Sequence, residues 1–141
     1  MLDTIIKATQ NFCTHQIRLN STVDNDVTKK RTLIAYIDID TQETKRYRIY
    51  LACEENFIQK VSKLFLEEDK SDEETLIDMA LEITNLIIGS AKVMAEESNN
   101  PYTISIPYFE KIGKFDFDYD QAKSVIVGED ELTIAIKESN D

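Results

Sequence analysis

The sequence has few of the residues on which several common kinds of site depend. Its 141 residues include two cysteines, Cys13 and Cys53, and a single histidine, His15. The cysteines lie far apart and have no partner at metal-ligand spacing, which argues against zinc and iron–sulfur sites and predicts reduced, structural thiols. One histidine excludes mechanisms that need two. We interpret His15 as a surface or capping residue rather than a catalytic one.

Long apolar segments are also missing. No run approaches the roughly 20 residues of a membrane-spanning helix, and the N-terminal Met-Leu-Asp-Thr lacks the basic and apolar regions of a signal peptide. We therefore expect a cytoplasmic protein that does not associate with membranes. With 42% apolar and 30% charged residues, the sequence is typical of a globular protein, and we expect residues 1–141 to form a single domain.

Basic residues become scarce in the second half of the chain. Residues 1–63 carry ten basic and eight acidic side chains, a net charge of +2, whereas residues 64–141 carry six and nineteen, a net charge of −13. An acidic half repels phosphate groups, so nucleic acids and anionic membranes are poor partners. The charge fits a protein partner, and it also fits the simpler interpretation that acidity provides solubility.

Hydrophobic periodicity predicts three helices. Apolar residues recur at helical spacing over residues 2–17, over residues 54–66 and over a long third segment. We expect Ser71 to cap the third helix, with Glu74 as its capping-box partner, and the helix to end near Glu97. It is the longest predicted element.

Alternating β-branched and aromatic residues predict the strands. Residues 32–40 and 45–53 should form an antiparallel hairpin, and further strands are expected at 102–107, 113–117, 122–127 and 132–137. The polar run 20–30 separates the first helix from the hairpin, and we interpret Lys29, Lys30 and Arg31 as a solvated loop rather than a partner contact. The predicted fold is α+β, with an antiparallel β-sheet covered on one face by helices.

One edge of the long helix stands out from the rest. At about 100° per residue, an apolar arc roughly 240° wide contains Leu86 and Val93 among others, so most of the helix should be buried. The remaining polar stripe consists of Asp78, Glu82, Asn85 and Gly89, which fall within about 60° of one another. Lys92 extends this stripe toward the end of the helix.

The ordinary interpretation of such a stripe is a solvated helix edge. Two features favour a functional one. Asp78 and Glu82 are like charges at i, i+4, which is mildly destabilising. Asn85 and Gly89 are poor helix formers, glycine costing about 1 kcal/mol relative to alanine.

The stripe and its surroundings resemble a known signature. Asp78-Met-Ala-Leu-Glu82-Ile-Thr-Asn85, followed at a distance by Pro107, is similar to the phosphatase motif of the CheC, CheX and FliY family of chemotaxis proteins. Leu86-Ile-Ile-Gly89-Ser-Ala and the predicted strand before Pro107 resemble the family's flanking segments. The order of elements also matches, and the single copy of the motif points to the CheX branch.

The resemblance implies a fold and an activity. Family members dephosphorylate CheY, a response regulator that carries an acyl phosphate on an aspartate, and CheX-type members form homodimers through their strands. Asn85 would then be the catalytic amide, and Glu82 would pair with a regulator lysine. Asp78, Gly89 and Lys92 would contact the partner. The regulator would bring Mg²⁺, so the chain would need no metal or cofactor of its own.

Two other hypotheses fit part of the sequence. A binding-only adaptor of the same fold could dock on a response regulator or flagellar switch component without hydrolysis, but it would have no need of the amide of Asn85. An acidic secretion chaperone would explain the net charge of −11 but not the polar stripe.

Overall fold

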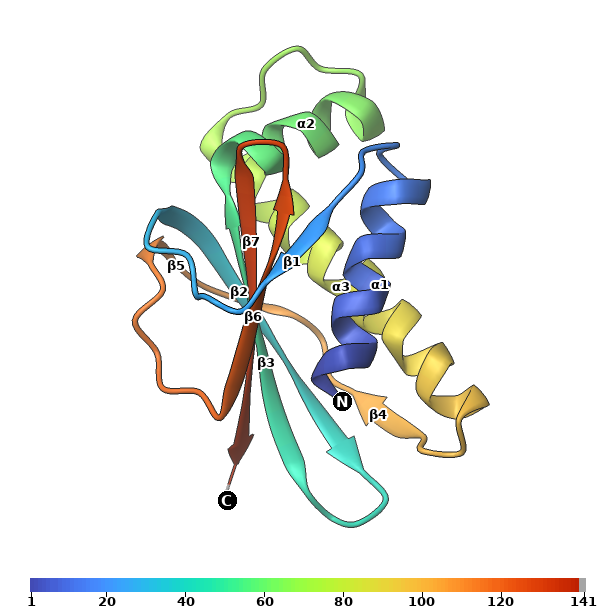
Figure 1. The fold of residues 1–141 in the computed structure, drawn as a ribbon. Coiled ribbons are helices and arrows are strands. Elements are labelled where there is room, and N and C mark those ends of the chain that lie inside the picture. The colour runs from blue at the N-terminus through green and yellow to red at the C-terminus, as the bar shows by residue number, and fades with distance from the viewer. Residues whose placement is uncertain (140–141) are drawn as a thin grey trace.

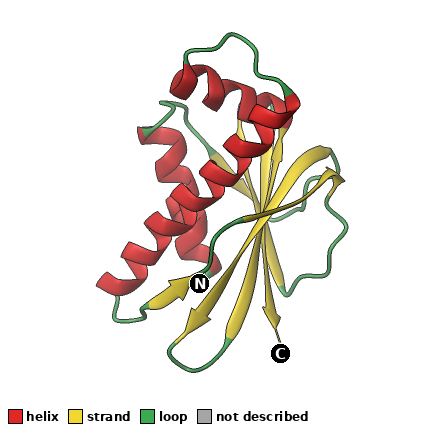
Figure 2. Ribbon diagram, turned by 180° about the vertical axis from the view of Figure 1, so that it is seen from behind, coloured by secondary structure: helices red, strands yellow, loops and turns green. Residues whose placement is uncertain are grey.

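Three helices lie on one side of a single β-sheet in the computed structural model, which describes residues 1–139. The helices are α1 (Leu2–His15), α2 (Glu55–Leu66) and α3 (Glu73–Glu97). Figures 1 and 2 show α1 and α3 packed side by side against the same face of the sheet, with α2 near one end of both. This arrangement confirms the predicted α+β fold with helices on one face.

The sheet is antiparallel throughout the described residues. Its order is β1-β6-β7-β3-β2-β4, and β5 pairs with the part of β2 that β4 leaves free. The strands are β1 (Thr22–Asp24), β2 (Arg31–Thr41), β3 (Arg46–Glu54), β4 (Tyr102–Ile104), β5 (Tyr108–Lys114), β6 (Gln121–Val127) and β7 (Asp130–Ser139). The predicted hairpin is β2 and β3, paired from Thr32↔Glu54 to Asp40↔Arg46.

The main hydrophobic core lies between the sheet and the helices. Alternation along β3 sends Ile49 and Leu51 into this core, whereas Tyr50 points to the opposite face. Both cysteines are free and buried, Cys13 on α1 and Cys53 on β3, as expected for structural thiols. His15 is the exposed last residue of α1, in agreement with its interpretation as a surface residue.

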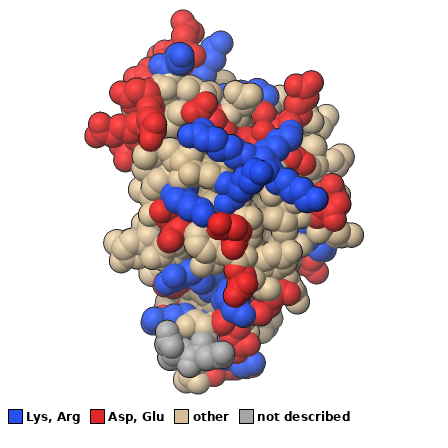
Figure 3. Space-filling model, turned by 90° about the vertical axis from the view of Figure 1, so that its left-hand side faces the viewer, with Lys and Arg blue, Asp and Glu red and all other residues tan. Residues whose placement is uncertain are grey.

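The other face of the sheet carries a smaller apolar cluster. The loop after β5 folds back over this face, where Phe117 stacks on Tyr50 with ring centroids 4.9 Å apart. Figure 3, which views the molecule from this side, shows Lys and Arg side chains gathered near the centre with acidic side chains around them. The acidity of the second half therefore does not make this face uniformly negative.

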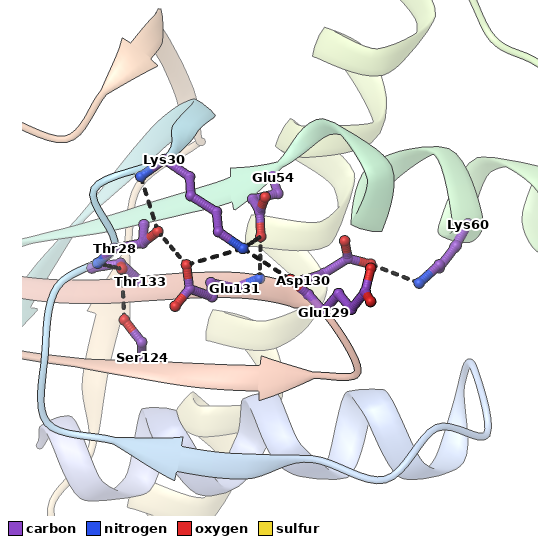
Figure 4. A network of polar contacts seen from close by, with 9 residues as sticks. All are labelled: Thr28, Lys30, Glu54, Lys60, Ser124, Glu129, Asp130, Glu131 and Thr133. Carbon is purple, nitrogen blue, oxygen red and sulfur yellow. Dashed lines mark hydrogen bonds and ion pairs between the residues drawn. The ribbon is translucent and has the colours of Figure 1, made fainter.

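A polar network ties the loop before β2 to the β6–β7 turn (Figure 4). Lys30 Nζ lies 3.6 Å from a carboxylate oxygen of both Glu54 and Glu131, and it donates to the carbonyl of Glu129 at 3.1 Å. Nearby, Lys60 Nζ on α2 donates to Asp130 at 2.7 Å. Lys29 and Lys30 lie in a loop as predicted, but Lys30 is bound by its own chain, and Arg31 begins β2.

Three strands differ from the prediction. The polar run 20–30 contains β1, an exposed three-residue strand that pairs with β6. Its pairing uses the backbone and buries no side chain, so periodicity gives no sign of it. The strand expected at 113–117 is instead β5, which begins directly after Pro107, and the strand expected at 102–107 ends at Ile104. Phe115 and Phe117 are apolar because they cover the open face of the sheet from a loop.

The cap of α3 also lies one residue from its predicted place. Asp72, not Ser71, precedes the helix, and its carboxylate accepts from the backbone N–H of Thr75 at 2.9 Å. The hydroxyl of Ser71 donates to Glu68 instead. The predicted end at Glu97 is confirmed.

Candidate functional site

The helix α3 is held to the sheet by a continuous buried side. Ile83, Ile87, Ile88 and Ala91 are fully buried, and the hydroxyl of Thr84 is satisfied within the helix by the carbonyl of Ala80, at 2.8 Å. These residues recur at three- and four-residue spacing, so the opposite side of the same turns must face away from the core. The polar stripe is on that outer side.

The structure places the predicted stripe at the surface. Asp78, Glu82 and Asn85 are exposed, and Gly89 is half-buried. Asp78, Glu82 and Asn85 make no side-chain hydrogen bond or ion pair with any residue of the described chain 1–139. Helical spacing brings them together along about two turns, with the amide of Asn85 one turn after the carboxylate of Glu82. The arrangement offers a partner one carboxylate and one neutral amide side by side.

Gly89 leaves a gap beside Asn85. A Cβ atom at this position would meet no heavy atom of the described residues within 4 Å beyond the backbone of its own helix and its two chain neighbours, so the packing of residues 1–139 does not require glycine there. Glycine in a helix interior is unfavourable by about 1 kcal/mol relative to alanine. The glycine therefore costs stability without serving the packing of this chain.

Lys92 is the one stripe residue whose side chain has a partner within residues 1–139. Its ammonium group donates to Glu96 at 2.9 Å, an i, i+4 pair on the helix surface. Exposed pairs of this kind are worth less than about 1 kcal/mol. Lys92 can therefore exchange Glu96 for another carboxylate at little cost.

Two apolar residues of α3 are not buried as expected. Leu86 is 39% exposed and Val93 is 53% exposed, so the buried arc is narrower than the apolar arc in the sequence. Leu86 is exposed because α1 and α3 leave an open groove between them next to the polar stripe, and Leu86 lies on its wall.

This groove, called the α1–α3 groove below, contains functional candidates that the sequence did not reveal. Its volume is about 550 Å³. Residues of all three helices line it, among them Phe12, His15, Phe65, Glu82, Leu86 and Ser90. Helical periodicity predicts Phe65 to be inside, but it is 36% exposed, and an edge-to-face contact with Phe12 at 6.3 Å holds it. Exposed apolar residues next to a polar stripe are a signal only once the fold is known.

Pro107, the last residue of the sequence signature, belongs to a different part of the chain from the stripe on α3. It is half-buried in the connection between β4 and β5, immediately before β5 pairs with β2 at Tyr108↔Tyr36. Two hydrogen bonds fix the preceding connection. The N–H of Ser105 donates to the carbonyl of Asp38, and the N–H of Asp38 donates to the hydroxyl of Ser105.

The described residues show neither a metal-binding cluster nor a membrane-spanning helix. Among residues 1–139, no group of three or more His, Cys, Asp or Glu side chains is placed to hold a metal ion. In the same residues, no helix has both the length and the apolar character needed to cross a bilayer.

Several solved structures of chemotaxis proteins have the same fold. CheX from Vibrio vulnificus superposes with a TM-score of 0.77 and 17% identity, covering 98% of both chains. CheX from Desulfovibrio desulfuricans gives 0.76 and 18%, covering 97% of both. The CheX chain of a CheX–CheY–BeF₃–Mg²⁺ complex from Borrelia burgdorferi gives 0.70 and 15%, covering 96% of this chain and 97% of that one. No protein of curated function gives a match in sequence.

The structural matches show the fold, and a family model shows the family. The model described as chemotaxis phosphatase CheX matches residues 35–129, which is more than half of the chain and includes α3 with its polar stripe. The stripe, the helices on one face of the sheet and the family model agree: this chain belongs to the CheX family of chemotaxis phosphatases.

Proposed function

We propose that this protein hydrolyses the aspartyl phosphate of a CheY-type response regulator in chemotaxis signalling. The observation that carries the proposal is the exposed pair Glu82 and Asn85, which has no bonding partner in residues 1–139 and stands next to the gap at Gly89. The family model and the CheX–CheY complex of Borrelia burgdorferi support a regulator of the CheY type as substrate. The proposal takes residues 1–141 as one phosphatase domain.

Asn85 acts on the attacking water in this proposal. Hydrolysis needs a water molecule in line with the phosphorus–oxygen bond that breaks, and an amide has both an acceptor and donors to hold it. The transition state of phosphoryl transfer is loose, so positioning and charge contribute more than a general base. Asn85 therefore positions the water without taking its proton.

Glu82 positions the partner. Its carboxylate pairs with a lysine beside the phosphoryl group of the regulator, and this ion pair fixes where Asn85 lies relative to the phosphorus atom. Asp78 and Lys92 contact the regulator on either side of this point. Gly89 leaves the space into which the phosphorylated loop region fits.

The regulator supplies the metal. Mg²⁺ prefers oxygen ligands such as carboxylates and phosphoryl oxygens, and the phosphorylated aspartate of the regulator brings phosphoryl oxygens. This chain contributes an amide and a carboxylate to the assembled site and has no cofactor of its own in the proposal.

We also propose a homodimer joined through strands and located in the cytoplasm, where CheY-type regulators act. β4 and β5 both pair with β2 and form one edge of the sheet. One side of β5 pairs with β2, and its other side is the outer edge. Unpaired strand edges are templates for pairing with a second chain. Sedimentation should give a mass about twice the 16.2 kDa of the chain, and a monomer would contradict this part of the proposal.

The test of the activity is the decay of phosphorylated CheY from the same cell in the presence of Mg²⁺. Wild-type protein should accelerate the decay, and Asn85→Ala should reduce the acceleration by about 100-fold or more, because loss of the positioning group misplaces the water. Asn56→Ala is the matched control, since Asn56 is an exposed helical asparagine on α2. Circular dichroism should be unchanged in both variants.

The outcomes separate the two functions considered. Basal decay with the wild-type protein, together with retained binding to the regulator, would establish the adaptor without hydrolysis. Full activity of Asn85→Ala would remove the amide from the mechanism. Loss of the helical signal in this variant would make Asn85 structural.

A further inference from the structure

The α1–α3 groove shares a wall with the polar stripe. Successive steps of four residues advance about 40° around a helix, so Glu82, Leu86 and Ser90 turn progressively from the stripe toward α1. All three line the groove, and Glu82 belongs to both surfaces. A partner that pairs with Glu82 must therefore cover the opening of the groove as well.

The groove combines apolar walls with one carboxylate. Leu86 and Phe65 line it and keep more than a third of their surface exposed. Exposed large apolar residues gathered at one place mark interaction surfaces. Within residues 1–139, no Lys or Arg lines the groove, and Glu82 is its one carboxylate. The fitting occupant is an apolar side chain with a cation next to it.

We propose that the α1–α3 groove is a docking groove, in which an apolar side chain on the receiver domain of the CheY-type regulator packs against Leu86 and Phe65. The inference rests on the proposed function, because the continuity of the groove with Glu82 and Asn85 identifies its occupant. It gives α1 and the end of α2 a part in recognition, and it explains why Leu86 and Phe65 are apolar although they are exposed. The groove binds the partner, while the stripe acts on it.

The contact between Phe12 and Phe65 supports this role. Phe12 is buried on α1, and its edge-to-face contact with Phe65 fixes the aromatic ring at the end of α2. A ring held in place loses little conformational entropy when a partner binds against it. The apolar wall is therefore ready for the partner before docking.

The test uses Leu86→Gln, which removes the apolar contact and keeps a good helix former at an exposed position. Its dissociation constant for the regulator activated by beryllofluoride and Mg²⁺ should rise about tenfold. In hydrolysis of phosphorylated regulator, the half-saturating concentration should rise by the same factor, with the maximal rate within about twofold of wild type. Ser90→Leu, which fills the groove from an exposed position, should act in the same direction.

Val93→Gln is the matched control. Val93 is also an exposed apolar residue of α3, seven residues after Leu86, but it does not line the groove. Its variant should bind as wild type does. The proposal is overturned by unchanged binding of Leu86→Gln and Ser90→Leu, by a loss in the maximal rate alone, or by an equal loss of binding in Val93→Gln. Absence of hydrolysis by the wild-type protein would instead contradict the proposed function, and the binding measurements would still decide the groove.

Discussion

Gly89 follows Asn85 by four residues on α3, so the exposed amide of Asn85 has no side chain one turn after it on the same face. The gap concerns the surface alone, because no atom outside the helix backbone occupies the place of a Cβ at position 89. Glycine at position 89 has two effects, a lower helix stability and an open approach to Asn85, and each can be measured separately.

The variant Gly89→Ala should be more stable than the wild-type protein. Alanine is favoured over glycine in a helix interior by about 1 kcal/mol, and a methyl group meets no obstacle here. Chemical denaturation should therefore give a free energy of unfolding higher by about 1 kcal/mol. A lower value would show that position 89 is under strain within the chain.

Gly89→Leu should fold as well as the wild-type protein and lose most of its phosphatase activity. A leucine side chain would project into the space beside Asn85 that the proposed function assigns to the phosphorylated region of the regulator. Activity is measured by decay of phosphorylated regulator, with thermal unfolding as the control for folding. Full activity would show that the partner does not approach Asn85 from this side.

The variant Glu82→Gln should bind the activated regulator more weakly, because an amide cannot replace the charge that pairs with a regulator lysine in the proposed function. Binding of the wild-type protein should weaken as salt is added, and binding of the variant should respond less to salt. Glu97→Gln, an exposed glutamate at the end of the same helix, is the control. Equal salt dependence in the wild-type protein and Glu82→Gln would exclude the ion pair.

The stability of the α3 cap should depend on pH. The hydrogen bond from the backbone N–H of Thr75, followed by the bond to its hydroxyl, lowers the pKa of Asp72 below its usual value of 3.8. Because the pKa of Asp72 is lower in the folded protein than in the unfolded chain, the charged carboxylate stabilises the fold above pH 3.8. This stabilisation is lost as the pH falls through the pKa of the folded state. The difference in unfolding midpoint between the wild-type protein and Asp72→Asn should therefore shrink in acid. A constant difference would contradict this.

The two cysteines should be unreactive in the native protein. Burial raises the pKa of Cys13 to about 11 and that of Cys53 to about 12, so neither forms the reactive thiolate near neutral pH. A thiol reagent at pH 8 should label them only as fast as the protein unfolds, and both should react at once in denaturant. Rapid labelling of the folded protein would show that one of them is accessible.

The sequence predicted the stripe because a single helix contains it. Asp78, Glu82, Asn85 and Gly89 are brought together by local helical spacing, and the buried side of α3 fixes which way they face. The same reasoning located all three helices to within a few residues. It failed for β1, whose pairing with β6 spans about a hundred residues of sequence and leaves its side chains exposed.

Helical periodicity could not predict the α1–α3 groove. Phe12 and Phe65 come from different helices, and Leu86 from a third, so their proximity depends on how the helices pack. Periodicity assigned Leu86 to the core because it lies next to buried positions. An apolar residue at the border of a helix face can belong to the core or to a binding surface, and only the neighbouring helix decides between them.

The fully buried side of α3 has a kinetic consequence. Ile83 and Ile87 are fully buried directly behind Glu82 and Asn85, so the stripe should keep its shape when a partner binds. Association that needs no rearrangement proceeds at the rates of rigid docking, about 10⁵–10⁷ M⁻¹s⁻¹, and mutations at such surfaces act mainly on dissociation. Substitutions along the stripe and the groove should shorten the lifetime of the complex and leave the rate of encounter nearly constant.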